Sequence, residues 1–253
     1  MTRTVALLFM LLLLPFRPLP VLAQVETDLE LVLLADATGS IDDAEIRFQR
    51  SGYAEAITSP QVINAIRNNA VGSIALTYVE WGDFTSQDVV VGWTRIDSLP
   101  SAQAFADQLM KAPRRARGRN AIGTALLFGK ALIESNGFNG LRRVIDLSAD
   151  SANNWNGTDI ETARSEVVKA GIIINGLAIL CRHCSGRPVS YDLEAAFARD
   201  IIGGPGSFVI TAENADNFAA AVRRKLVLEI GGYQGNRSFA SAKRSNEPPR
   251  LNE

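Results

Sequence analysis

The sequence predicts an α/β fold, a doubly wound and mostly parallel sheet with one antiparallel edge strand. Three observations lead to this prediction. Apolar segments alternate along the chain with segments of helical periodicity, which is the pattern of βαβ units. Most apolar segments lack regular polar positions, as expected of strands buried on both faces of a parallel sheet. Two of them, residues 73–81 and 88–94, are joined by a short polar link, so we expect this pair to run antiparallel.

The first strand and helix set the pattern for the chain. Residues 31–35 are four aliphatic residues and an alanine, which predict a strand buried on both faces. Residues 42–58 follow, with Ile46, Tyr53 and Ile57 on one helical face. The same two periodicities predict helices over residues 60–67, 101–111, 158–170, 191–202 and 215–230, a helix from Asn120 that ends within residues 137–140, and strands over residues 142–150, 172–179 and 207–210.

The two ends of the chain differ from this pattern. Arg3 precedes an apolar run over residues 5–14 and a group of small residues, which predicts a secretory signal peptide over residues 1–23. The apolar run is too short to span a bilayer. We therefore expect an exported protein, periplasmic or extracellular, with no stable membrane span after cleavage. Glycine, serine, asparagine, proline and charged residues then predict a disordered tail over residues 231–253, after one domain over residues 24–230.

Composition argues against a nucleic-acid partner. The chain has 26 Lys and Arg residues and 27 Asp and Glu residues, a formal charge of −1 that becomes −3 once Arg3 and Arg17 leave with the signal peptide. Nucleic-acid binding relies on an excess of basic residues. We interpret one local basic cluster as a solvated loop. It consists of Arg114, Arg115, Arg117 and Arg119.

Oxygen-bearing side chains follow the first strand at every second position. They belong to Asp36, Thr38 and Ser40, and Gly39 lets the backbone curl so that all three can face one centre. Mg²⁺ and Mn²⁺ prefer such oxygen ligands in octahedral geometry. The alternative is a helix cap, because Ser40 and Asp43 have the spacing of a capping box.

A second carboxylate favours the metal site over the cap. Asp150 ends the predicted strand over residues 142–150, as Asp36 ends the first strand. Because ligands of such sheets bind outside the carboxyl ends of the strands, the two carboxylates should meet at one edge. Asp146 lies in the middle of the same strand, and we interpret it as a buried carboxylate that accepts hydrogen bonds from amides.

The two cysteines, Cys181 and Cys184, are expected to form a local disulfide, because an exported protein meets an oxidising compartment. Their spacing is shared with thiol oxidoreductases, so redox catalysis is the alternative. Residues 185–188, which follow them, are typical of a loop rather than of the helix that activates such a thiol.

The loop after the first strand does not match a hydrolase motif. Aspartic proteases have the sequence Asp-Thr-Gly-Ser without the intervening Ala37, and they need a paired second carboxylate. A phosphatase that forms an aspartyl-phosphate needs a second aspartate where Thr38 stands. We find no complete catalytic constellation and therefore expect a protein that is not an enzyme.

The order of elements and the loop from Asp36 to Ser40 resemble the von Willebrand factor A-like domain, a Rossmann-like doubly wound fold. Four further segments resemble a bacterial exported branch of that superfamily, which is catalogued as a domain of unknown function. The likeness covers nearly all of the mature chain. The four segments are Tyr78-Val79-Glu80-Trp81, Arg142-Arg143-Val144-Ile145-Asp146-Leu147-Ser148, Ile174-Asn175-Gly176-Leu177 and Ile202-Gly203-Gly204-Pro205-Gly206.

The resemblance implies a metal-ion-dependent adhesion site, and three positions depart from its usual pattern. Thr38 replaces a serine but keeps the hydroxyl, Asn120 replaces a threonine and offers an amide oxygen, and Ser151 replaces a glycine. The implied ligands of one Mg²⁺ or Mn²⁺ are Asp36, Thr38, Ser40, Asn120 and Asp150.

The function that the resemblance implies is that of a protein-binding module. In the superfamily, the cation exposes an open coordination position, and an acidic side chain of a protein partner fills it. No catalytic base is needed for this role. The alternative is that the three departures have removed the metal and left a binding scaffold that works without it.

Overall fold

The computed structural model describes residues 24–180 and 190–232. Its strands are β1 (Val25–Asp36), β2 (Ile74–Trp81), β3 (Gln87–Ile96), β4 (Phe138–Ala149), β5 (Ile173–Ile179) and β6 (Val209–Ala212). Its helices are α1 (Asp43–Ile57), α2 (Pro60–Arg67), α3 (Leu99–Lys111), α4 (Ile122–Glu134), α5 (Ile160–Lys169), α6 (Leu193–Ala196), the π-helix η1 (Phe197–Ile201) and α7 (Ala215–Gly231).

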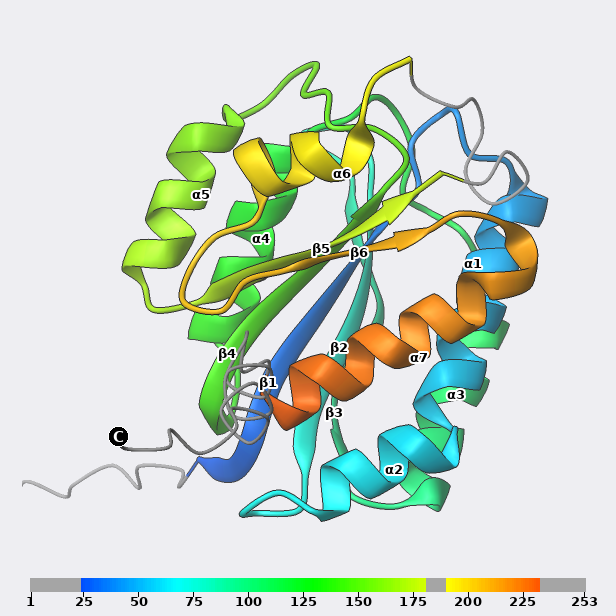
Figure 1. The fold of residues 1–253 in the computed structure, drawn as a ribbon, viewed down its shortest axis with the longest axis vertical. Coiled ribbons are helices and arrows are strands. Elements are labelled where there is room, and N and C mark those ends of the chain that lie inside the picture. Colours follow the sequence, from blue (N-terminus) through cyan, green and yellow to red (C-terminus); the bar gives the residue numbers. More distant parts are fainter. Residues whose placement is uncertain (1–23, 181–189, 233–253) are drawn as a thin grey trace, which may run out of the picture.

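The six described strands form one sheet in the order β3-β2-β1-β4-β5-β6 (Figure 1). Neighbouring strands run parallel, except that β3 pairs antiparallel with β2 at one edge. The predicted fold class is therefore confirmed, including the antiparallel edge strand.

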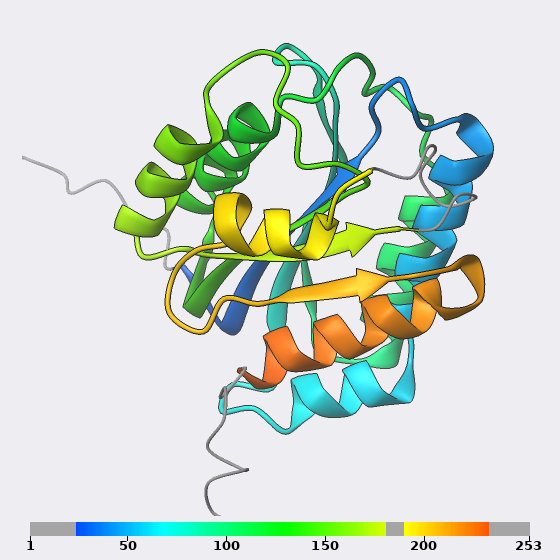
Figure 2. The ribbon, with the colours of Figure 1, turned by 45° about the horizontal axis from the view of Figure 1, so that its top comes forward.

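The central strand β1 contributes to two separate cores, because successive side chains of a strand face opposite sides of the sheet. Leu31 and Leu33 pack in the core under α1, α2, α3 and α7, whereas Val32 and Leu34 pack in the core under α4, α5 and α6. Figures 1 and 2 show these two helical layers on either side of the sheet. The strand is thus buried on both faces, as its aliphatic run predicts.

β1 and β4 both begin earlier than the sequence predicts. β1 begins at Val25, and β4 begins at Phe138, inside the segment 137–140 that the sequence assigns to a helix end. The two extensions pair in parallel, with Val25 opposite Phe138. A side chain at Gly140 would lie 2.8 Å from the backbone nitrogen of Glu30. The glycine therefore allows the two strands to approach closely and does not end a helix.

The helices agree with the predicted ranges within about two residues, with one further difference. The predicted helix over residues 191–202 is a short α-helix, α6, that continues as the π-helix η1. α4 begins at Ile122, which leaves Asn120 in the loop before it. This placement frees the Asn120 side chain to take part in a site at the sheet edge.

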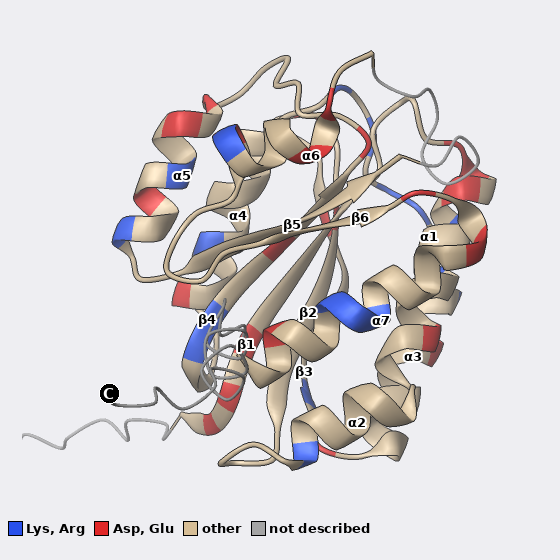
Figure 3. Ribbon diagram, viewed as in Figure 1, with Lys and Arg blue, Asp and Glu red and all other residues tan. Residues whose placement is uncertain are grey.

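Some sequence predictions fall outside the described residues. They concern the signal peptide over residues 1–23, the pair Cys181 and Cys184, and the tail from residue 233. Among the helices that the structure describes, none combines the length and the apolar character needed to cross a membrane. Acidic and basic side chains are interspersed over the described helices (Figure 3).

Asp146 is buried, as predicted, but its charged partner comes from α7 and has no local signal in the sequence. Asp146 Oδ1 lies 2.8 Å from Lys225 Nζ, and both side chains are 1% exposed. Lys225 also pairs with Glu229 one helical turn further on, and Asn175 donates to Glu229 Oε1 over 3.0 Å. Burial and the charge of Glu229 raise the pKa of Asp146 to about 7, in spite of Lys225. This buried charge cluster ties α7 to the sheet.

We expect Lys225→Met to lower the free energy of unfolding by about 3–5 kcal/mol, because it leaves buried carboxylates without their cation. Urea denaturation at neutral pH measures the change. Lys169→Met removes an exposed lysine of α5 and serves as the control, with an expected change within about 0.5 kcal/mol. Equal losses in the two variants would contradict this role of Lys225.

Candidate metal centre

The parallel strands β1 and β4 deliver two carboxylates to the same edge of the sheet. Ala35 lies opposite Ser148 in the register of the two strands, so Asp36 and Asp150 leave the sheet within one residue of the same level. Asp36 is fully buried, and Asp150 is 7% exposed. The backbone of Asp150 lies close enough to the Asp36 carboxylate to act on its pKa, which it lowers. The structure thus brings these two predicted site residues together.

The first loop, residues 37–42 between β1 and α1, folds around the Asp36 carboxylate. The backbone N–H of Thr38 donates to Asp36 Oδ1 over 2.8 Å, and the hydroxyl oxygens of Thr38 and Ser40 lie 3.2 Å apart. The Ser40 hydroxyl also opposes the rise in the pKa of Asp150, so the loop reaches the residue that follows β4. In the described part of the chain, Asp36 Oδ2 is a buried oxygen with no hydrogen-bond partner.

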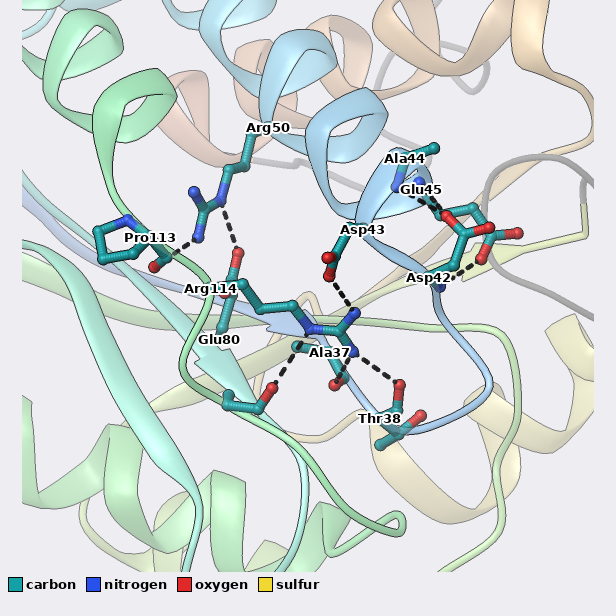
Figure 4. A network of polar contacts seen from close by, with 11 residues as sticks. Ala37, Thr38, Asp42, Asp43, Ala44, Glu45, Arg50, Glu80, Pro113 and Arg114 are labelled. Atoms are coloured by element: carbon teal, nitrogen blue, oxygen red, sulfur yellow. Dashed lines mark hydrogen bonds and ion pairs between the residues drawn. The ribbon is translucent and has the colours of Figure 1, made fainter.

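The predicted alternative for Ser40, a capping box with Asp43, is wrong. Helix α1 is capped by Asp42, whose carboxylate accepts hydrogen bonds from the backbone N–H groups of Ala44 and Glu45 over 2.7 and 2.9 Å. The Glu45 side chain completes the box by accepting from the Asp42 N–H over 2.7 Å (Figure 4). The oxygens of the first loop are therefore not needed to cap the helix.

A second loop enters the site through Asn120. Its side-chain amide donates to the Ser151 hydroxyl over 3.0 Å, and its backbone carbonyl accepts from the N–H of Trp155 over 2.8 Å. The Gly118 carbonyl accepts from the N–H of Gly39 over 2.7 Å, which joins this loop to the first one. Two of the departures from the family pattern, Asn120 and Ser151, thus bond to each other. The amide oxygen of Asn120 is left for another contact.

Arg114 holds the first loop in place. Its guanidinium donates to the carbonyl oxygens of Ala37 and Thr38 over 2.9 and 3.2 Å and pairs with Asp43 at 3.0 Å (Figure 4). Only 14% of the Arg114 side chain is exposed. The interpretation of the arginine cluster as a solvated loop is therefore wrong for this residue. The other three members, Arg115, Arg117 and Arg119, are exposed.

A second buried arginine supports the segment that carries Arg114. Arg50 of α1 pairs with Glu80 of β2 at 2.7 Å, and the two side chains are 4% and 0% exposed. Arg50 also donates to the carbonyl of Ala112 and, as Figure 4 shows, to that of Pro113, directly before Arg114. The roles of both arginines have no local signal in the sequence, because their partners lie 30 or more positions away.

Burial makes both site carboxylates hold their protons more tightly than usual. It raises the pKa of Asp36 to about 6, against hydrogen bonds from Thr38 and Asp150 and the charge of Arg114. It raises the pKa of Asp150 to about 8, with a further contribution from the charge of Asp36. A cation beside the two carboxylates would favour their ionised forms.

The site opens into a surface depression of about 450 Å³. The described residues contain no group of three or more histidine, cysteine or acidic side chains arranged to hold a metal ion. A cation at this edge would therefore rely on two carboxylates and on neutral oxygens. The depression is lined by Thr38, Gly39, Ser40, Gly118, Arg119, Asn120 and Trp155.

Solved structures share this fold at low sequence identity. Proximal thread matrix protein 1 (PTMP1) from the mussel byssus is 15% identical, with a TM-score of 0.58 over 82% of this chain and 47% of that chain. The pilus adhesin SpaC from Lactobacillus rhamnosus GG is 14% identical, with a TM-score of 0.57 over 81% of this chain and 31% of that chain.

Two more structures bear on the fold and the site. A von Willebrand factor type A protein from Catenulispora acidiphila is 15% identical, with a TM-score of 0.53 over 81% of this chain and 43% of that chain. Another structure of PTMP1, 14% identical with a TM-score of 0.57 over 82% of this chain and 48% of that chain, has zinc in its MIDAS motif. The chain spans less than half the length of each of these proteins.

A comparison with curated proteins finds no match. A family model matches residues 26–234, nearly the whole described part of the chain. Together with the sheet order and the solved structures, this match confirms the resemblance found in the sequence. The chain belongs to the family described as "Protein of unknown function (DUF1194)", and its fold is that of a von Willebrand factor A domain.

Proposed function

We propose that the protein is a metal-ion-dependent, adhesion-type binding module and not an enzyme. One Mg²⁺ or Mn²⁺ would bind at the carboxyl edge of the sheet. The observation that carries this proposal is the pair of buried carboxylates, in which Asp36 Oδ2 has no hydrogen-bond partner among the described residues. The proposed ligands are Asp36, Thr38, Ser40, Asn120 and Asp150.

The chemistry of these residues fits a hard divalent cation. Two carboxylates, two hydroxyls and one amide supply oxygen donors of the kind that Mg²⁺ and Mn²⁺ prefer. Two negative charges nearly neutralise the ion. A bound cation would supply an open coordination position to an acidic side chain of the partner protein. The arginine that fixes the first loop binds carbonyl oxygens and Asp43, so it leaves the proposed ligand oxygens accessible.

The matched proteins support a binding role in a general way. PTMP1 comes from a byssus matrix, and SpaC is a pilus adhesin. From these proteins we infer only a general role, the binding of another protein. The proposal also includes export to the periplasm or the extracellular space after cleavage of residues 1–23, a domain over residues 24–230, a disordered tail over residues 231–253 and a disulfide between Cys181 and Cys184.

One observation favours a second candidate, a binding scaffold without metal. Asn120 and Ser151 hydrogen bond to each other over 3.0 Å, so each of these two substituted positions has a partner within the protein. The orphan oxygen of Asp36 is not explained by this candidate. The two candidates differ in one measurable property, which is the affinity for a divalent cation.

Calorimetric titration with Mg²⁺ and Mn²⁺ should detect one site in the wild-type protein. We expect Asp36→Ala to weaken binding by at least about 100-fold, because loss of a residue that only supports a ligand already costs about 10–100-fold. Asp107→Ala removes an exposed carboxylate of α3 and should leave the affinity unchanged. If the wild-type protein bound neither cation at millimolar concentration, the metal-free scaffold would be the correct function.

In the metal-free protein, the free energy of unfolding should fall as the pH rises from about 4 to about 8. Asp36 and Asp150 have pKa values of about 6 and about 8 in the folded state, above the ordinary value of 3.8. The native state therefore binds more protons than the unfolded state over this range, so each rise in pH destabilises it until the group has ionised. Urea denaturation in EDTA at a series of pH values measures this slope.

Asp36→Asn should make this slope shallower without removing it, because Asp150 and Asp146 also have raised pKa values. Saturating Mg²⁺ should oppose the loss of stability at high pH, since it binds the ionised carboxylates of the native state. A free energy of unfolding that rose steadily between pH 4 and pH 8 in EDTA would contradict the burial of these carboxylates.

A further inference from the structure

One wall of the depression is formed by a cation and an aromatic ring rather than by the proposed metal ligands. The guanidinium carbon of Arg119 lies 5.4 Å from the centre of the Trp155 ring. Trp155 is 63% exposed, and Arg119 is also exposed. Both residues line the same depression as Thr38, Ser40 and Asn120. A large apolar ring at such an exposed position marks a surface that suits a binding partner.

Both residues are attached to the backbone of Asn120, beside the candidate metal centre. The backbone N–H of Trp155 donates to the carbonyl of Asn120, a proposed ligand, and Arg119 is the residue before Asn120. Stacking on the ring uses the face of the guanidinium and leaves the N–H donors at its edge free. These donors form a fork that matches a carboxylate.

Arg119 has no acidic partner among the residues that the structure describes. None of the ion pairs between described residues involves it. Two other arginines of the same loop differ in this respect, because Arg114 pairs with Asp43 at 3.0 Å and Arg115 with Asp88 at 3.6 Å. Arg119 is therefore a cation in position for a negative group from another molecule.

Helix α4 adds positive potential on the same side. It begins at Ile122, two residues after Asn120; its N-cap residue, Ala121, makes no side-chain capping hydrogen bond, and the N–H of Gly123 donates to Asn154 Oδ1 over 3.3 Å. The N-terminal end of a helix carries a partial positive charge that favours anions. Taken with the free charge of Arg119, this favours an acidic occupant of the depression over a basic one.

We infer that Arg119 and Trp155 form an acidic subsite beside the metal centre, which binds a second carboxylate of the partner segment. This inference rests on the proposed function, in which a first carboxylate completes the metal site. In an extended peptide, side chains two residues apart lie on the same side at a distance of about 6.5 Å. The occupant that we assign is an acidic segment, and two carboxylates at this spacing are its simplest form.

Two labelled peptides test the subsite by fluorescence anisotropy in the presence of Mg²⁺. One has the sequence Gly-Asp-Gly-Asp-Gly, and the other has the sequence Gly-Asp-Gly-Asn-Gly, both with blocked ends. We expect the wild-type protein to bind the peptide with two carboxylates about fivefold more tightly, which is the upper range for an exposed ion pair. Arg119→Gln should abolish this preference and leave the affinity for the other peptide unchanged. Arg115→Gln, at an arginine that already has a partner, should keep the preference.

The same titrations in EDTA separate the subsite from the metal centre. Binding that needs Mg²⁺ and shows the preference supports both proposals. Binding that survives EDTA and still depends on Arg119 supports the subsite and contradicts the role of the metal. Equal affinities of the two peptides for the wild-type protein, a preference that persists in Arg119→Gln, or no binding of the peptide with two carboxylates in either condition would overturn the subsite.

Discussion

The parallel pairing of β1 with β4 is the constraint on which the rest of the structure depends. These two strands occupy the middle of the sheet, and β1 supplies side chains to both hydrophobic cores. The packing of these side chains holds the observed register, because a shift by one residue would send each of them to the opposite core. The same register brings Asp36 and Asp150 to one edge. The site is thus a consequence of how the core packs.

Two of the buried acids of this protein are paired with a buried cation. Glu80 is neutralised by Arg50 at 2.7 Å, and Asp146 is paired with Lys225 at 2.8 Å. The two carboxylates at the sheet edge form no ion pair with another described residue, and Arg114 donates to backbone carbonyls and to Asp43. Burying carboxylates without a cation costs free energy. That cost favours the proposed cation at this edge over a cation beside Glu80 or Asp146.

The departures from the family pattern change the site in a coordinated way. Asn120 reaches further than a threonine, and Ser151 adds a hydroxyl where a glycine is usual, and the two side chains hydrogen bond to each other. The same loop carries Arg119, and the Asn120 carbonyl holds Trp155 through its backbone N–H. The loop of residues 118–120 therefore contributes both to the candidate metal centre and to the aromatic wall of the depression. The shape of this wall thus depends on the position of Asn120, a proposed metal ligand.

The sequence by itself determined the fold class, the order of the elements and the meeting of Asp36 with Asp150, because aliphatic runs, helical periodicity and carboxylates at strand ends are local patterns. Only the tertiary structure showed the polar starts of β1 and β4, the cap at Asp42, and the partners of Arg50, Arg114 and Lys225. The partners of the two arginines and of Lys225 lie 30 to 79 positions away along the chain, whereas the cap at Asp42 is a local pattern with Glu45 three residues on. Such distant pairs leave no periodic pattern in the sequence, because the two residues become neighbours only in the folded protein.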